Sequence, residues 1–277
     1  MYPLKGFIIV LKLFLKEHLK LNKRIEVIKR CALEAGEILK YYYSNDLNVR
    51  FKGKIDMVTD ADTSSQERII DIIKSEFPDD EIIAEESSKN TLNLKSTWII
   101  DPLDGTTNFV HRLPWFAISI AYLYNGDIKL GLIYIPILNE LFFAIKGEGA
   151  FLNEKRISVS EEDCLEKCLV GTGFPYSIHE NYEEIVTRFK KVLINVRGIR
   201  RPGAAAQDLA YVACGRFDAF YEDGLKPWDV AAGILLVNEA GGKVTDYKGE
   251  EYKIGQSNQI LASNLLLHEK IKELISL

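Results

Sequence analysis

The sequence predicts a protein of mixed class, α+β in its first half and α/β in its second. Residues 117–124 and 128–135 have the pattern of two strands joined at Asn125-Gly126-Asp127, a strong signal for a tight hairpin turn. After residue 160, strand patterns alternate with helix patterns, which is typical of α/β architecture. The chain has 277 residues, of which 47% are hydrophobic, so it can bury a large core.

Residues 1–23 are predicted to form a helical N-terminal extension. The apolar run is interrupted by Lys12, lacks a small-residue cleavage site and is shorter than the ~18–20 residues that a membrane span needs, so we expect no stable span. Two alternatives to a plain amphipathic helix stay open: a gene start placed too early, and a helix that binds a membrane surface or a partner. Four residues carry the helical spacing: Leu4, Ile8, Leu11 and Leu15.

The elements of the first half follow in order. Residues 24–43 repeat apolar side chains with helical periodicity. In 63-TSSQ-66, Thr63 followed by Gln66 predicts a capping box that opens a second helix, which Pro78 ends. Two short apolar strands end in acidic residues: 82–84 before Glu85-Glu86, and 98–100 before Asp101.

A third strand at 140–145 is expected to extend the hairpin. The later elements are strands at 168–171, 217–221 and 259–262, and helices at 181–196, 204–214, 228–240 and from 265. No Pro- or Ser-rich linker divides the chain. We therefore expect an N-terminal half, residues 24–155, with the acidic motifs, and a C-terminal half, residues 156–277, that share an interface.

Charge and cysteine content narrow the partner and the compartment. The formal net charge is −5 with no basic tract, which argues against nucleic acid as a partner. The four cysteines are scattered, and no histidine lies near Cys164 and Cys168 to complete a zinc site. We expect plain reduced thiols in a cytoplasmic protein.

Several phosphate chemistries lack their sequence signatures. There is no G-x-x-x-x-G-K-[ST] loop, and the G-x-G-x-x-G test fails at 171-GTGFPY-176 and at 147-GEGAFL-152. A D-x-D phosphoaspartate nucleophile needs aspartates two apart, whereas Asp101 and Asp104 are three apart. The four histidines are isolated and no G-x-S-x-G elbow occurs, so a nucleophilic serine or histidine lacks support.

The stretch 98-WIIDPLDGTTNF-109 points instead to a metal ion beside a phosphate. Pro102 imposes an extended or turn geometry on Asp101, and the chain curls at Gly105, so both aspartates and the intervening carbonyl can face one point. Hard cations such as Mg²⁺ prefer oxygen ligands of this kind, completed by water and substrate phosphate. The residues from Gly105 to Asn108 offer backbone N–H groups and hydroxyls to an anion.

Other acidic residues have simple structural explanations when each is taken alone. Asp62 and Asp229 can accept hydrogen bonds from free N–H groups at the start of a helix. Glu85 and Glu86 can be solvated. These readings stay open beside the functional ones.

Four motifs in order resemble those of the inositol monophosphatase family, the lithium-sensitive, magnesium-dependent sugar-phosphate phosphatases. The similarity covers residues 24–277, and it implies an α/β/α/β/α layered sandwich and a homodimer. The motifs are 56-DMVTDAD-62, 85-EES-87, 101-DPLDGTTNF-109, and 228-WDVAAG-233 followed by 239-EAGG-242.

The resemblance also implies a role for each site residue, with two to three Mg²⁺ ions as cofactors. The first metal ion would be held by Glu86, Asp101 and the Leu103 carbonyl, and the second by Asp101, Asp104 and Asp229. Asp62 and Thr106, with Glu86, would activate the attacking water. The phosphate would lie on the Gly105 and Thr106 amides, and the sugar side would carry Glu222, with Arg200 and Ala205 nearby. A loop at 51–60, with Lys52 or Lys54, would close over the site.

The resemblance has two departures and leaves the substrate open. Ala84 stands where the family usually has Gly, and Arg112, also in a common Gly position, puts a cation near the site or the dimer contact. We expect hydrolysis of a polyol or sugar phosphate, with inositol monophosphate preferred. The alternatives are fructose-1,6-bisphosphatase activity, alone or in addition, and relatives acting on histidinol phosphate, 3′-phosphoadenosine 5′-phosphate or NADP. A phosphatase fold with a binding or regulatory role is a more remote one.

Overall fold

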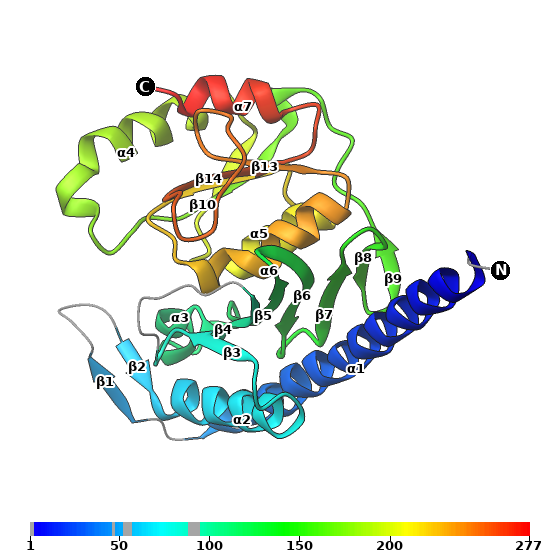
Figure 1. Cartoon of the computed structure of the whole chain (residues 1–277). Coiled ribbons are helices and arrows are strands. Elements are labelled where there is room, and N and C mark those ends of the chain that lie inside the picture. The colour runs from blue at the N-terminus through cyan, green and yellow to red at the C-terminus, as the bar shows by residue number, and fades with distance from the viewer. Residues whose placement is uncertain (1–2, 46–47, 52–56, 88–94) are drawn as a thin grey trace.

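The computed structural model describes residues 3–45, 48–51, 57–87 and 95–277, without the side chains of residues 3–20 and 51. The elements form five layers (Figure 1): a helix pair, a seven-stranded sheet, a second helix pair, a five-stranded sheet and a third helix pair. The predicted fold class, an α/β/α/β/α layered sandwich, is confirmed.

The first layer contains α1 (Pro3–Ser44) and α2 (Asp60–Glu76). The predicted extension and the predicted helix at 24–43 are one uninterrupted helix, whose N-terminal end projects past β9 in Figure 1. The side chains of the predicted stripe, Leu4 to Leu15, lie outside the described residues. Within the part of the chain that the structure describes, no helix is both long and apolar enough to cross a membrane.

The start of α2 corrects the predicted capping box. The N-cap is Thr59, whose hydroxyl accepts the Ala61 N–H at 3.1 Å, while the Asp62 carboxylate accepts the Thr59 N–H at 2.7 Å. The box predicted at Thr63 and Gln66 is wrong, because this earlier Thr-x-x-Asp satisfies the free N–H groups first. The Gln66 side chain instead accepts the Glu86 N–H at 3.0 Å.

The seven-stranded sheet has the order β3-β4-β5-β6-β7-β8-β9. Only β3 and β4 are parallel; the other neighbours are antiparallel. The predicted hairpin is confirmed, because Tyr124 pairs with Asp127 and the φ angles of Asn125 and Gly126 are 52° and 84°. The strands are β3 (Glu81–Ala84), β4 (Ser96–Asp104), β5 (Ala117–Tyr124), β6 (Asp127–Ile135), β7 (Glu140–Ile145), β8 (Gly149–Leu152) and β9 (Lys155–Ile157).

The five-stranded sheet has the order β11-β10-β12-β14-β13, with β10 parallel to both of its neighbours. Its strands are β10 (Leu169–Thr172), β11 (Gly198–Arg200), β12 (Ala219–Asp223), β13 (Lys243–Thr245) and β14 (Gln259–Ser263). Four short elements lie outside the two sheets: β1 (Val49–Phe51) and β2 (Met57–Thr59), which pair with each other, α3 (Thr106–Val110) and the 3₁₀ helix η1 (Leu165–Lys167).

The middle helices α5 (Ala205–Ala213) and α6 (Pro227–Glu239) lie between the two sheets, and α4 (Ile178–Leu193) and α7 (His268–Ile275) cover the far side of the second sheet (Figure 1). One buried core joins side chains of β5 and β6 with those of α5 and α6. A Cβ at Gly131 in β6 would lie 2.8 Å from the Ala232 carbonyl oxygen, so α6 approaches the sheet very closely. The middle helices thus bridge the two predicted halves; the division at 155/156 stays a prediction.

A buried ionic group ties α1 to the first sheet. Arg24 donates to Asp80 at 2.8 Å, and its guanidinium lies between the rings of Phe77 and Tyr122, 4.2 and 4.5 Å from their centroids. Trp98 also donates its indole N–H to Asp80, at 3.0 Å. The Arg24 charge is therefore paired with a carboxylate, as buried charges require, although its Nε has no hydrogen-bond partner.

Arg112 caps the other end of α1. Its guanidinium donates to the carbonyls of Tyr42, Tyr43 and Asn45, at 2.8 Å for Tyr42 and 2.6 Å for Asn45. No basic residue lies in the last turn of α1, so Arg112 supplies the cation that the helix C-terminus favours. The cation predicted near the site or the dimer contact therefore has a structural use.

Candidate active site

Asp101 and Asp104 lie at the end of β4, on either side of a bulge. Regular pairing with β5 stops at Asp101 and resumes at Asp104. The bulge lets the Asp101 carboxylate accept the Leu103 N–H at 3.0 Å, while the Leu103 side chain is buried in the core. The sequence pair is therefore brought to one edge of the sheet with the Leu103 carbonyl between them.

Two helix N-termini from the second half meet these acids. Asp104 accepts the Ala206 N–H at 2.7 Å from the first turn of α5. Asp229, in the first turn of α6, accepts the Lys226 N–H at 2.7 Å. The partial positive charge of a helix N-terminus favours a carboxylate. Asp229 thus makes the hydrogen bond expected of an acid at a helix start. It also lies close to Asp104, whose charge, after burial, raises the pKa of Asp229.

The three aspartates disfavour one another's ionisation. Burial raises the pKa of Asp101 well above its usual range, and the charges of Glu85, Asp104 and Asp229 raise it further. Burial likewise raises the pKa values of Asp104 and Asp229 to about 7. In the described residues none of the three forms an ion pair with a lysine or arginine. These carboxylate oxygens are the ligands that a hard divalent cation prefers, and such an ion would relieve the repulsion between the aspartates.

As the side chains stand, the described residues contain no group of three or more His, Cys, Asp or Glu arranged to hold a metal ion. Each of Asp101, Asp104 and Asp229 already accepts a backbone N–H. Lys52 and Lys54 of the predicted closing loop lie outside the described residues.

The structure favours Glu85 over the predicted Glu86 as the fourth acid of this cluster. Ala84 pairs with Ile100 in the parallel β3–β4 ladder, and the Glu85 N–H donates to the Ile100 carbonyl at 3.2 Å. Glu85 therefore comes directly after β3 at the level of Asp101 in β4, and its charge acts on both Asp101 and Asp104. Equivalent positions after two parallel strands were the signal in the sequence that could have selected Glu85.

Asp62 and Thr106 form the hydrogen bond that the family resemblance implies. The Thr106 hydroxyl lies 3.0 Å from Asp62 Oδ1 and 3.1 Å from the Leu103 carbonyl oxygen. Thr106 begins α3 after Gly105, whose φ is 90° and whose Cβ, if present, would lie 2.8 Å from the Trp115 carbonyl oxygen. A side chain at Gly105 would be both strained and crowded. The catalytic role of the pair stays a prediction.

Glu222 is the penultimate residue of β12 and lies near Asp104 and Asp229. Loss of hydration raises its pKa, the Asp229 charge raises it further, and Arg201 lowers it. The Arg200 guanidinium, by contrast, donates to the Ile199 carbonyl at 3.0 Å. The structure therefore favours Arg201, rather than the predicted Arg200, as the cation beside Glu222. Ala205 is the buried first residue of α5.

Asp223, next to Glu222, is engaged by other side chains. It accepts from Tyr247 at 3.1 Å and from Gln259 at 2.8 Å, and it lies 3.5 Å from Arg188. Its carboxylate is therefore part of a structural network.

Asp208 is a buried acid that the sequence reading missed. It is 1% exposed, and its Oδ1 has no hydrogen-bond partner. Burial raises its pKa well above the usual range, and the charges of Glu222 and Asp104 add to this effect. Its position in the first turn of α5 could be read from the sequence, but its burial beside the site depends on the packing of α5.

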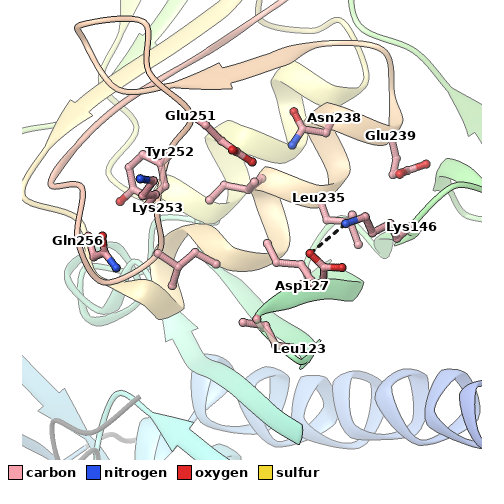
Figure 2. Close-up of a pocket in the computed structure, with 14 residues that line it drawn as sticks. Leu123, Asp127, Lys146, Leu235, Asn238, Glu239, Glu251, Tyr252, Lys253 and Gln256 are labelled. Carbon is pink, nitrogen blue, oxygen red and sulfur yellow. Dashed lines mark ion pairs between the residues drawn. The ribbon is translucent and has the colours of Figure 1, made fainter. Parts of the chain in front are cut away.

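A separate cleft of about 370 Å³ lies between the β5–β6 turn, the C-terminal half of α6 and residues 251–256 (Figure 2). Lys146 and Asp127 form an ion pair of 3.3 Å in its wall. None of the predicted site residues lines this cleft. Tyr252 also lines this cleft. Burial raises the pKa of Tyr252, and the charge of Asp229 raises it further.

Known proteins place the chain in a family. The model of the inositol monophosphatase family matches residues 20–276. An inositol monophosphatase of Dictyostelium discoideum is 42% identical, over 92% of this chain and 94% of that protein. A fructose-1,6-bisphosphatase/inositol-1-monophosphatase of Thermotoga maritima is 40% identical, over 91% and 96%. The crystal structure of the extragenic suppressor protein suhB from Bartonella henselae has a TM-score of 0.87 at 40% identity, over 92% and 98% of the two chains. With the fold and the acidic site it contains, this chain belongs to the inositol monophosphatase family and is a phosphatase.

Proposed function

We propose that this protein hydrolyses the phosphate monoester of a polyol, with inositol monophosphate as its preferred substrate and Mg²⁺ as its cofactor. The observation that carries the proposal is the cluster of Asp101, Asp104 and Asp229: desolvation and neighbouring acidic charges raise the pKa of each, and none has a basic ion-pair partner among the described residues. Two or three Mg²⁺ ions, when bound, would neutralise phosphate oxygens and acidify water.

The proposed ligands of the ions are those that the family resemblance implies, with one change that the structure supports. Asp101 is proposed to serve both principal ions, the first with Glu85 and the Leu103 carbonyl, and the second with Asp104 and Asp229. Glu85 replaces the predicted Glu86 because its charge acts on the aspartates. The three aspartates are proposed to turn carboxylate oxygens toward the ions on binding, while the N–H groups of Leu103, Ala206 and Lys226 anchor them.

The attacking water is proposed to be oriented by Thr106. The Thr106 hydroxyl can donate to Asp62 Oδ1 at 3.0 Å, and its oxygen is then proposed to accept a hydrogen bond from the water. Asp62 is itself fixed by the Thr59 N–H at 2.7 Å, so the hydroxyl has a defined orientation. The water oxygen adds to phosphorus, the ester P–O bond breaks, and the products are the polyol and inorganic phosphate.

Substrate choice is proposed to depend on Glu222. A carboxylate at this position can accept hydrogen bonds from vicinal hydroxyls and would repel a second phosphate, which favours a polyol monophosphate. Among the described residues, Arg201, whose charge lowers the pKa of Glu222, favours the bisphosphatase alternative that the name of the Thermotoga protein carries. We further propose a cytoplasmic homodimer, as the family resemblance implies.

The test is phosphate release from a panel containing inositol 1-phosphate, fructose 1,6-bisphosphate and 3′-phosphoadenosine 5′-phosphate, each with Mg²⁺ and with EDTA. We expect the highest kcat/KM for inositol 1-phosphate and no turnover with EDTA. Equal or higher efficiency on the bisphosphate would move the substrate assignment to the alternative. Turnover that persists in EDTA would overturn the metal assignment.

A further inference from the structure

The two glycines of 171-GTGFPY-176, which do not belong to a nucleotide-binding loop, lie beside the proposed sugar side of the site. β10 pairs in parallel with β12, with Thr172 opposite Tyr221, and the Thr172 hydroxyl donates to the Tyr221 carbonyl at 2.8 Å. Gly173 and Glu222 follow directly after this pair. The ladder thus sets Gly173 against Glu222, although 49 positions separate them in the sequence.

Gly173 leaves space that the Glu222 carboxylate fills. A Cβ added at Gly173 would lie well within 3.0 Å of Oε1, Oε2 and Cδ of Glu222, a distance that real Cβ atoms essentially never show. Gly173 is not among the glycines with positive φ, so its backbone would accept an L-residue without strain. Glycine is needed at this position for space alone.

The surrounding packing determines which group would move. A Cβ at Gly171 would lie 2.9 Å from the Phe217 ring, and one at Gly224 would lie 2.9 Å from Pro175, so the two segments interlock on both sides of the contact. The Glu222 backbone is also paired to Ile260 of β14. With both backbones held, an added methyl at Gly173 must displace the Glu222 side chain, whose carboxylate is its flexible end.

We propose that Gly173 is a positioning residue that sets the place of the Glu222 carboxylate and, through it, the preference for polyol phosphates. The inference rests on the proposed function, in which Glu222 accepts hydrogen bonds from substrate hydroxyls. A shift of the carboxylate by the width of a methyl group removes those hydrogen bonds while leaving its charge in the site. Gly173→Ala therefore tests the position of the Glu222 carboxylate without removing the carboxylate.

The first experiment compares inositol 1-phosphate with p-nitrophenyl phosphate, a monoester that has no hydroxyls to read. Gly173→Ala should lower kcat/KM about tenfold or more for inositol 1-phosphate, the scale of a lost polar contact, and less than about threefold for p-nitrophenyl phosphate. Gly198→Ala is the matched control, because a Cβ there meets its nearest atom at 3.4 Å, and φ is not in the left-handed region. It should leave both values unchanged. Equal losses on both substrates would overturn the proposal.

The second experiment is a double-mutant cycle with Glu222→Ala, which removes the carboxylate that the methyl would meet. In that background Gly173→Ala should change kcat/KM for inositol 1-phosphate less than about twofold. A further loss would show that Gly173 acts by another route. If Gly173→Ala alone fails to fold, the double variant should fold, because the clash is gone; failure of both would also overturn the proposal.

The outcomes separate this inference from the function on which it rests. If Glu222→Ala lowers inositol phosphate efficiency and Gly173→Ala does not, the positioning role is wrong and the substrate reading stands. If Glu222→Ala has no effect on inositol phosphate, the substrate reading is wrong.

Discussion

Replacing Asp104 by asparagine should abolish magnesium-dependent turnover and stabilise the metal-free fold. In the folded, metal-free protein, burial raises the Asp104 pKa from 3.8 to about 7. The unfolded chain therefore releases this proton at lower pH than the folded protein does. The resulting decrease in the free energy of unfolding is absent below pH 3.8, grows between pH 3.8 and about 7, and is constant above pH 7. At about 1.4 kcal/mol per pKa unit the full cost at pH 8 is about 4 kcal/mol.

We expect Asp104→Asn to recover about 1–4 kcal/mol of this cost, because an asparagine oxygen still accepts the Ala206 N–H and the neighbouring acids share the repulsion. The measurement is thermal unfolding at pH 8, where about 1 kcal/mol shifts the midpoint by about 2–4 °C. The variant should unfold at higher temperature than wild type in EDTA. Saturating Mg²⁺ should reverse that order, since the ion stabilises only the protein that binds it.

Phosphate release supplies the other half of this test. Loss of a two-metal arrangement should lower kcat by several powers of ten. A purely structural Asp104 predicts the opposite pattern, lower stability in EDTA with little loss of rate. That pattern, or retention of more than about a tenth of wild-type activity, would refute the reasoning.

Four further predictions address other parts of the molecule. Glu222→Gln should lower kcat/KM for inositol 1-phosphate by about 5–150-fold, equivalent to about 1–3 kcal/mol, with a smaller change for fructose 1,6-bisphosphate; equal changes would withdraw the role in selection. Lithium at millimolar concentration should inhibit phosphate release, and insensitivity would weaken the closeness to the inositol branch of the family. Burial lowers the His268 pKa from 6.5 to about 4, so the free energy of unfolding should fall by about 3 kcal/mol as the pH falls from 6.5 to 4. His268→Gln should reduce the change of the urea midpoint with pH over that range. An unchanged pH dependence would exclude His268 as the cause. Asp80→Ala should lower the free energy of unfolding by about 3–5 kcal/mol by leaving Arg24 buried without its partner, and a loss below about 1 kcal/mol would show that the pair is dispensable.

Local signals predicted the elements that carry them. The Asn125-Gly126 turn was readable because few residues adopt left-handed φ angles, and long periodic stretches such as α6 were readable from their apolar positions. Short strands such as β1, β9 and β13 were not predicted, because three residues hold too little periodicity and take their structure from pairing. The helix start at Thr59 was missed because a second plausible cap followed four residues later.

In the candidate site, too, some features could be predicted from local sequence and others depended on the folded chain. The order of the acidic motifs was sufficient to indicate the chemistry. Choosing Glu85 rather than Glu86, or Arg201 rather than Arg200, rested on the structure, because the pairing of β3 with β4 and the charges that surround Glu222 are set by the folded chain. Gly173 was recognisable only through a partner contributed by another strand.

The hydrogen bond between Asp104 and the Ala206 amide joins residues 102 positions apart, and Asp229 lies a further 23 positions along the chain. During synthesis, therefore, the acidic motif of β4 emerges long before the helix ends that receive it. At about 5–20 residues per second, the ribosome needs roughly 6–25 s to go from Asp104 to Asp229. Through that interval the proposed magnesium site still lacks Asp229, so added magnesium should not accelerate folding. Sensitivity to the ion should therefore begin late, only when α6 has left the exit tunnel, and a chain truncated before Asp229 should be indifferent to it.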